Sequence, residues 1–257
     1  MGLETLHSWA TAESDRIVIK NRFNDTTLFE ASGMGIKQAV VEAHKKGVNL
    51  TRANLMRTDL RQTRLPGFKM LDGNLYGVDF SFACLDGAEI RETYLRKAIM
   101  SETRLNGADL SLSCLAEANL SHASLRGCVM ERVDLGKAKL HQANLTGTSL
   151  EGSKLNKADM SKANLARVNL VGARLVNTNL VLANLTMADF SGADLSGARL
   201  TMDRSFHRAC FAGARIDGTV FFDSKGQSRT GGKITPDGRI VFDDAAGEDE
   251  VQTQQSA

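Results

Sequence analysis

A large apolar residue occupies every fifth position of the chain from Leu50 to Leu200, which makes thirty-one positions without an exception. Twenty-four of these residues are leucine, and the others are methionine, phenylalanine or isoleucine. A helix repeats about every 3.6 residues and a strand about every 2, so neither element returns a side chain inward at this period. The chain must therefore turn a corner in each five-residue unit, which predicts a solenoid.

Small residues stand two positions before each of these large ones. Sixteen of them are alanine, nearly all the others are Val, Thr, Ser, Cys or Gly, and only Phe68 is large. Side chains two apart in an extended segment point to the same side, so each unit is expected to bury one large and one small side chain. No charged residue occupies either column between Val48 and Met202. The predicted core includes Leu50, Leu55, Leu60, Leu65, Met70, Leu75, Phe80, Leu85, Leu105, Leu110, Leu120, Leu165, Leu195 and Leu200.

Two columns of glycine indicate how many units close one coil. One column runs from Gly67 to Gly147 and the other from Gly152 to Gly192, and both have a spacing of 20 residues. Twenty residues are four units, which predicts a square coil with four faces. Stacked coils would pair their backbones about 4.8 Å apart, as strands do. The glycines would lie at corners, where a positive φ costs other residues more free energy.

Segments such as Ala118–Leu120, Ala163–Leu165 and Ala193–Leu195 match the motif A(D/N)LXX when their two following residues are included. In this motif the chain resembles the pentapeptide-repeat family over about 60% of its length. The resemblance implies an all-β solenoid, a right-handed quadrilateral β-helix, which we expect to have about nine coils. It says little about function, because the motif residues form the core and the outward residues vary freely.

The segments outside the repeat predict a structure at each end. Residues 1–47 are expected to form a leader that covers the first coil, with a β-hairpin at 16–31 and a helix at 35–46. The β-helix would span residues 48–222, with a frame slip at 201–205 that suggests a β-bulge. Residues 223–257 would form a hairpin around Pro236 and an acidic, disordered tail. Beyond the slip, the period of five continues through Phe206, Phe211, Ile216 and Phe221.

Composition narrows the class of protein further. No apolar run approaches the roughly 18 residues that would cross a membrane, and the start of the chain does not resemble a signal peptide. The spacing of the four cysteines fits no zinc pattern, so we expect reduced thiols, with Cys128 filling the core. These features predict a cytoplasmic, bacterial protein without a metal or cofactor.

Charge argues against the best-known activity of the family. Several pentapeptide-repeat proteins bind type II topoisomerases by imitating the shape and negative charge of DNA, and they inhibit gyrase or protect it from drugs. Such mimicry requires a continuous acidic stripe. The outward residues of the face that contains Leu55 instead sum to +4, and those of the opposite face to +3. The candidate basic face carries Arg96, Lys97, Lys154, Lys157 and Arg174. Its charge is too dilute to favour nucleic acid.

Two other outward features suggest contacts. One is an apolar group near the C-terminal end, which could form a homodimer interface or be covered by the C-terminal hairpin. Its members are Val176, Val181, Leu182, Met187 and Met202. The other is a looser apolar group of Leu71, Tyr76, Phe82 and Tyr94, which the leader could cover.

Neighbouring Glu102, His122, Ser161 and His141 hint at catalysis, but a flat face excludes no water, so we expect no enzyme. The sequence thus favours a non-enzymatic binding or scaffold protein with an unknown protein partner. The alternative is a topoisomerase-binding protein.

Overall fold

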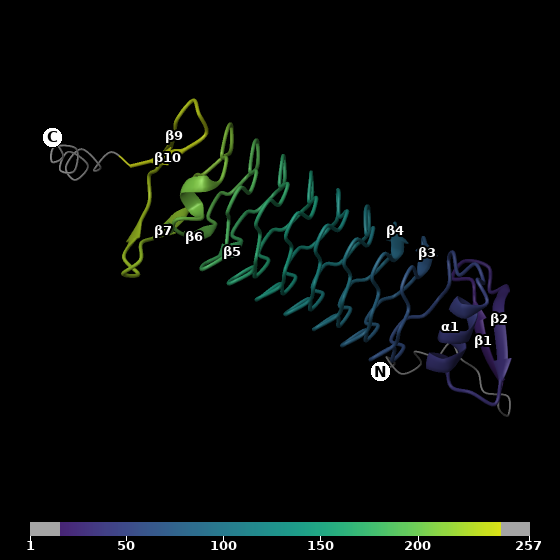
Figure 1. Ribbon diagram of the computed structural model, residues 1–257. Coiled ribbons are helices and arrows are strands. Elements are labelled where there is room, and N and C mark those ends of the chain that lie inside the picture. The colour runs from purple at the N-terminus through teal and green to yellow at the C-terminus, as the bar shows by residue number, and fades with distance from the viewer. Residues whose placement is uncertain (1–15, 243–257) are drawn as a thin grey trace, which may run out of the picture.

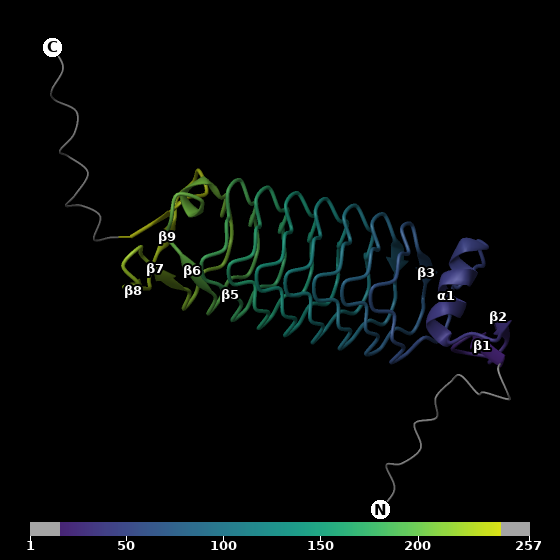
Figure 2. The same ribbon diagram turned by 60° about the horizontal axis from the view of Figure 1, so that its bottom comes forward.

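The computed structural model describes residues 16–242 of the chain. Within this range the chain winds into a rod of stacked coils, with a helix and a hairpin at one end and short strands at the other (Figures 1 and 2). The expectations for the first fifteen residues, including Trp9, and for the acidic tail from Asp243 lie outside the described residues. The one α-helix has ten residues, and no helix in residues 16–242 is long and apolar enough to cross a membrane.

Backbone pairing between residues 20 apart confirms the four-unit coil. Parallel bridges join Asn54 to Asn74 and Asn74 to Tyr94, and the same step of 20 continues along the rod to the bridge between Arg174 and Asp194. The hydrogen bonds of these bridges are about as long as in any sheet, for example 2.9 Å from Leu55 N to Asn74 O. Each coil therefore lies directly on the next, and all four faces run straight along the rod.

Regular strands are short because a tight turn interrupts each five-residue unit. Only one or two residues per unit remain extended, so most of the ladder consists of single bridges. The strands are β1 (Arg16–Lys20), β2 (Thr27–Ser32), β3 (Lys69–Leu71), β4 (Glu89–Arg91), β5 (Asn179–Leu180), β6 (Arg199–Thr201), β7 (Val220–Phe222), β8 (Ser228–Arg229), β9 (Lys233–Ile234) and β10 (Ile240–Val241). The helices are α1 (Ile36–Lys45) and the short 3-10 helix η1 (Phe206–Arg208).

The corner two residues after each core position has a positive φ. The predicted glycines show it, with a φ of 67° at Gly67 and 65° at Gly192, but so does every other residue at this position from Arg52 to Gly197. Glycine therefore occupies only a third of these corner positions, and the other corners carry residues with side chains. The left-handed conformation costs an L-residue on the order of 1 kcal/mol, and the repeat accepts this cost at twenty non-glycine corners, from Arg52 to Met187.

Replacement of a corner lysine by glycine should therefore stabilise the rod. Lys137 has a φ of 59°, whereas Lys139 forms an ordinary bridge with Asp159. We expect Lys137→Gly to raise the free energy of unfolding, while Lys139→Gly lowers it, with a difference of about 1–2 kcal/mol between the variants. Urea unfolding of both proteins measures this difference. Equal destabilisation by both would contradict the left-handed corner at Lys137.

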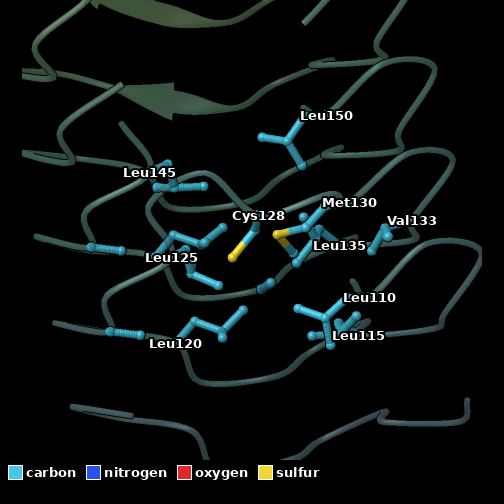
Figure 3. Close-up of a cluster of buried hydrophobic side chains, with 14 of the residues drawn as sticks. Leu110, Leu115, Leu120, Leu125, Cys128, Met130, Val133, Leu135, Leu145 and Leu150 are labelled. Atoms are coloured by element: carbon cyan, nitrogen blue, oxygen red, sulfur yellow. The ribbon is translucent and has the colours of Figure 1, made fainter. Parts of the chain in front are cut away.

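The interior contains the two predicted columns and is close to fully buried. Each large core position from Leu50 to Leu200 has a relative exposure of 1% or less, and Figure 3 shows successive layers, from Leu110 and Leu115 to Leu145 and Leu150, stacked along the axis. Thr103, Thr148 and Thr178 are also buried, and each hydroxyl donates to a backbone carbonyl of the preceding coil. Polar atoms in the small-residue column are thus satisfied internally.

Cys128 lies in this interior as predicted. Its side chain is 1% exposed, and its Sγ lies 2.9 Å from Leu105 O (Figure 3). The described cysteines are all free thiols. Burial raises the pKa of the Cys128 thiol from 9.0 to about 12.

This shift predicts a pH dependence of stability. Between pH 9 and about 12 the unfolded chain releases the Cys128 proton while the folded protein keeps it, so the free energy of unfolding falls as pH rises. At about pH 10.5 the loss should be about 2 kcal/mol. Comparison with Cys128→Ala, whose alanine suits this column, isolates the effect from other titrating groups. From about pH 8 to about pH 10.5, the free energy of unfolding of wild type should fall by about 2 kcal/mol more than that of Cys128→Ala. An equal fall in both proteins would contradict the prediction.

The frame slip falls where it was predicted, but it is not a β-bulge. The step between paired residues changes from 20 to 21, so that Asp189 pairs with Cys210 and Leu200 with Phe221. The additional residue is absorbed by η1, which begins where Asp203 Oδ1 accepts hydrogen bonds from Ser205 N and Phe206 N. A tight turn was favoured over a bulge because the aspartate can cap it.

The aromatic residues beyond the slip fill the last coil. Phe206, Phe211 and Phe221 are at most 2% exposed, and the ring centroid of Phe206 lies 5.3 Å from that of Phe211 and 5.7 Å from that of Phe221. Ile216 was assigned to the core but is only partly buried against it. The chain then forms two antiparallel pairs, β7 with β8 and β9 with β10. The turn between β9 and β10 contains Gly238, whose φ is 79°.

At the other end, β1 and β2 form the hairpin and α1 packs beside it. Asp25, in the turn between the strands, has a φ of 56°, and Gly47 with a φ of 66° follows the end of the helix. Ala39, Val40 and Ala43 of α1 are fully buried. The hairpin also pairs with the first coil, since Asn54 N donates to Lys20 O at 2.9 Å and Arg22 N donates to Arg52 O at 2.7 Å.

Candidate interaction faces of the rod

Four faces run along the rod, and each is named here after its first core residue. The Leu50, Leu55, Leu60 and Leu65 faces begin at residues 48–52, 53–57, 58–62 and 63–67 and recur every 20 residues. On each face the side chains of three residues per unit point outward, so residues 20 apart form columns of neighbours. Any function that involves contact must use these columns.

The predicted basic Leu55 face divides into two parts. In its first half, Glu117 receives ion pairs from both Arg96 and Lys97, the latter with 3.8 Å between Nζ and Oε2. The hydrogen bond from Arg96 lowers the pKa of Glu117, which keeps this carboxylate charged near neutral pH. Glu117 therefore offsets one of the two positive charges of Arg96 and Lys97, which weakens the basic character of this half.

In the second half of the Leu55 face the cations lie closer together. Lys154 and Arg174 form a backbone bridge in neighbouring coils, and Lys157 lies at the corner of the same unit as Lys154. Among the described residues no ion pair involves these three side chains. Asp134 and Asp194 flank them in the same column, so the cluster is small and of mixed charge at its edges.

The five residues of the predicted apolar patch do not form one surface. Val176 lies on the Leu55 face, Val181 and Leu182 on the Leu60 face, and Met187 at the far corner of the Leu65 face. Only Val181, Leu182 and Met202 come together, because the pairing of Leu180 with Leu200 places Met202 in the column of Leu182. The sequence columns place Leu182 and Met202 next to one another, whereas Val176 and Met187 lie on the neighbouring faces.

The C-terminal segment covers only part of this group. Met202 is partly buried against the core, and its N–H donates to Phe222 O at 2.7 Å. Leu182 and Met187 remain 56% and 53% exposed. Within residues 16–242, the C-terminal hairpin therefore does not cover Leu182.

Residues 16–47, the part of the leader that the structure describes, do not cover the second apolar group. Leu71, Phe82 and Tyr94 are 42%, 56% and 36% exposed. Tyr76 is partly buried because its ring stacks on that of Tyr94, with centroids 5.9 Å apart. These residues lie over the end of the rod, where they pair with Arg52 and Ala53, and not over its sides.

The serine and histidine side chains are not arranged for catalysis. Ser161 Oγ donates to Asp159 Oδ1 at 2.7 Å and lies 2.8 Å from His141 Nδ1. A hydroxyl has one proton, so Nδ1 of His141 must act as the donor and cannot accept the proton of Ser161. Burial alone would raise the pKa of Asp159, but the hydrogen bonds from Ser161 lower it overall. The group forms a polar network on the surface, and in residues 16–242 no cluster of three or more His, Cys, Asp or Glu side chains could hold a metal.

A cavity of about 490 Å³ was not anticipated from the sequence. It lies on the Leu50 face at the N-terminal end, between the segment that follows α1 and the strand β3. Residues 48–51 and 67–71 line it together with His44, Gly47, Glu89 and Arg91, but Leu50, Phe68 and Met70 are each only 1% exposed. The sequence did not predict this cavity, because the repeat pattern treats every pair of neighbouring coils as equivalent.

Comparisons with known proteins agree with this architecture. The family model described as "Pentapeptide repeat region" matches residues 98–175, and the model "Pentapeptide repeats (8 copies)" matches residues 74–111 and 163–201. The chain belongs to the pentapeptide-repeat family, whose fold is the right-handed quadrilateral β-helix. A search of curated proteins gave no match.

Several solved structures are similar to the chain. HetL, a pentapeptide repeat protein involved in heterocyst differentiation regulation from the cyanobacterium Nostoc sp. strain PCC 7120, is 29% identical; the match covers 81% of this chain and 100% of that chain, with a TM-score of 0.33. A trypsin-treated form of QnrB1, a plasmid-mediated fluoroquinolone resistance protein, is 20% identical over 65% of this chain and 89% of its own, with a TM-score of 0.43. A pentapeptide repeat protein from the Arabidopsis thaliana thylakoid lumen is 31% identical over 40% of this chain and 68% of its own, with a TM-score of 0.18.

Proposed function

We propose that the protein is a non-enzymatic binding or scaffold protein that presents the faces of its rod to a protein partner in the cytoplasm. The observation that carries this proposal is the exposure of Leu182 on the Leu60 face of a regular rod. A surface that is ordered before binding loses little conformational entropy when a partner docks. Exposed apolar side chains then contribute favourable free energy when the partner buries them. A solenoid of about nine coils, closed by the leader and the C-terminal hairpin, supplies the rigidity.

The surface around Leu182 is the first region to test. Leu182→Asp combined with Met202→Asp should abolish partner binding, because a carboxylate would have to be desolvated at the interface. Gln142→Asp is the matched control, since Gln142 lies in the same column two coils away. Affinity capture from the native host with wild type, the double variant and the control identifies any protein that only the double variant loses. Capture of the same proteins by all three would contradict the proposal for this surface.

A second copy of the chain is the alternative occupant of this surface. Light scattering of purified wild type would then give the mass of a dimer, and the double variant at Leu182 and Met202 would give that of a monomer. A monomeric wild type would exclude the homodimer.

The competing function is binding of a type II topoisomerase, which membership of the family suggests. The positive sums of the Leu55 and Leu65 faces disfavour it, since a DNA mimic must be acidic. A gyrase supercoiling assay with and without a quinolone distinguishes the two functions. Inhibition or protection at micromolar protein would overturn the preferred function, and no effect would exclude the competing one.

A further inference from the structure

An apolar stripe runs along the first half of the Leu55 face. The bond from Arg57 N to Tyr76 O, 2.8 Å long, stacks the coil of Met56 on that of Tyr76. The ring of Tyr76 stacks on that of Tyr94, with centroids 5.9 Å apart and an angle of 14° between the planes. Tyr94 is 36% exposed and pairs with Cys114 in the next coil. Met56, Tyr76, Tyr94 and Cys114 therefore form one continuous surface, the Tyr94 stripe.

Cations border the Tyr94 stripe on the side toward the Leu60 face. The guanidinium group of Arg57 lies 5.7 Å from the ring centroid of Tyr76, and no ion pair in residues 16–242 involves Arg57. Arg96 and Lys97 share the single carboxylate of Glu117. Three cations and one carboxylate give this border a net charge of +2. An occupant of the stripe should thus combine apolar side chains with negative charge.

The hairpin places the start of the described chain near this border. Asn21 pairs with Ala53 in the antiparallel direction, and Asn54 N donates to Lys20 O at 2.9 Å. Because the two segments run in opposite directions, the residues before Lys20 extend along the first unit of the Leu55 face toward Arg57. β1 therefore begins on the side of this face where the cations lie.

The composition of residues 1–15 complements the Tyr94 stripe. Leu3, Leu6 and Trp9 recur at a spacing of three, and the segment has three acidic residues and no lysine or arginine. Trp9 precedes Arg16 by seven residues, which span at most about 23 Å. Tyr94 lies two coils beyond the first, at about 10 Å along the rod. The chain is thus long enough to bring Trp9 onto the stripe.

We propose that residues 1–15 dock on the Tyr94 stripe of their own rod, with the indole ring of Trp9 against Tyr76 and Tyr94. Burial of the aromatic side chains favours this contact, and the carboxylates of the segment lie near Arg57 and Lys97. The covalent link gives the segment an effective concentration on the order of millimolar, which a separate molecule seldom reaches. A partner that uses this face must therefore displace the segment.

The fluorescence of Trp9 tests this docking directly, because Trp9 is the one tryptophan of the full chain. Acrylamide should quench it about threefold less in wild type than in a synthetic peptide of residues 1–15, since a docked indole ring is shielded from water. Its emission should also lie at a shorter wavelength than that of the peptide. Both values should stay constant between about 0.1 and about 10 µM protein, because the contact is intramolecular.

Two aspartate variants locate the site. Tyr94→Asp removes a ring of the stripe at a position of the unit where Asp109 and Asp134 occur naturally, so the rod should accept it. Quenching of Trp9 should then rise about threefold, to the value of the peptide. Val129→Asp is the matched control, since Val129 occupies the same position of a unit on the Leu50 face and is 39% exposed. It should quench like wild type, as should Tyr94→Phe, which keeps the ring.

Circular dichroism during thermal unfolding checks that each variant keeps the rod. The proposal is overturned if wild type is quenched as strongly as the peptide, or if Tyr94→Asp leaves Trp9 as shielded as in wild type. Equal exposure of Trp9 by Val129→Asp would remove the assignment to the Leu55 face. Shielding that grows with protein concentration would assign the contact to a second copy and overturn docking within one chain. The Tyr94 stripe and the Leu182 surface lie on different faces at opposite ends of the rod, so either proposal can fail alone (Figure 1).

Discussion

Leu120→Ala should lower the free energy of unfolding by about 2–5 kcal/mol. Leu120 is fully buried in the core cluster, and Figure 3 shows it in the layered interior beside Leu125. Removal of its isobutyl group would leave a cavity that flanking coils cannot fill, because the backbone bonds of both neighbours fix their spacing, as from Leu120 N to Lys139 O at 2.7 Å. Urea unfolding monitored by circular dichroism measures the change.

The matched control is the same substitution at an outward corner. Leu112 is 48% exposed, so Leu112→Ala should change the free energy of unfolding by less than about 0.5 kcal/mol. Similar losses of unfolding free energy in Leu120→Ala and Leu112→Ala would mean that the large residues at every fifth position do not form the interior.

Val40→Asp should detach the leader and destabilise its docking by about 3–5 kcal/mol. Val40 of α1 is fully buried and belongs to the core cluster, so an aspartate there would place a carboxylate in apolar surroundings. Loss of the leader would expose the edge at Ala53 and Asn54, which now pairs with Asn21 and Lys20. An exposed edge recruits other chains, so we expect self-association that grows with protein concentration.

Gln38→Glu adds the same charge on the exposed side of α1 and keeps the oxygen that accepts the Gly35 N–H. Light scattering over a concentration series should show a constant mass for this control and a rising mass for Val40→Asp. A monodisperse Val40→Asp protein would show that the first coil needs no cover.

The interior of the rod was predictable because the same requirement, an uncharged inward side chain, applies in every five-residue unit. A buried charge is too costly to occur unpaired, so both inward columns are visible in the sequence from Val48 to Leu200. The step of 20 could be derived from Gly67 and its column because glycine is favoured at left-handed corners. The other corners carry residues such as Phe82 and Lys137, which show no such preference, so their conformation was not predictable.

The surface was less predictable, since its contacts depend on which side chains lie next to one another in neighbouring columns. The pairing of Arg96 and Lys97 with the single Glu117 requires knowledge of side-chain direction across a step of about 20 residues. The backbone at Lys69 was not predictable for a different reason. No bond joins Lys69 to residues 48–50, where the chain leaves α1 through the bond from Val48 N to Ala43 O, and a repeat pattern contains no information about local structure at its end.

The step of 20 residues has a consequence for comparing surfaces among proteins of this kind. Two residues that are neighbours across coils, such as Lys154 and Arg174 with their backbone bridge, are 20 positions apart in the chain, whereas Leu182 and Met187 are close in sequence but lie on different corners. An alignment shifted by one unit of five preserves every core residue and rotates the whole surface by a quarter turn. Sequence identity can therefore be high between two rods that show different sides to a partner, and surfaces should be compared column by column with the coil as the unit.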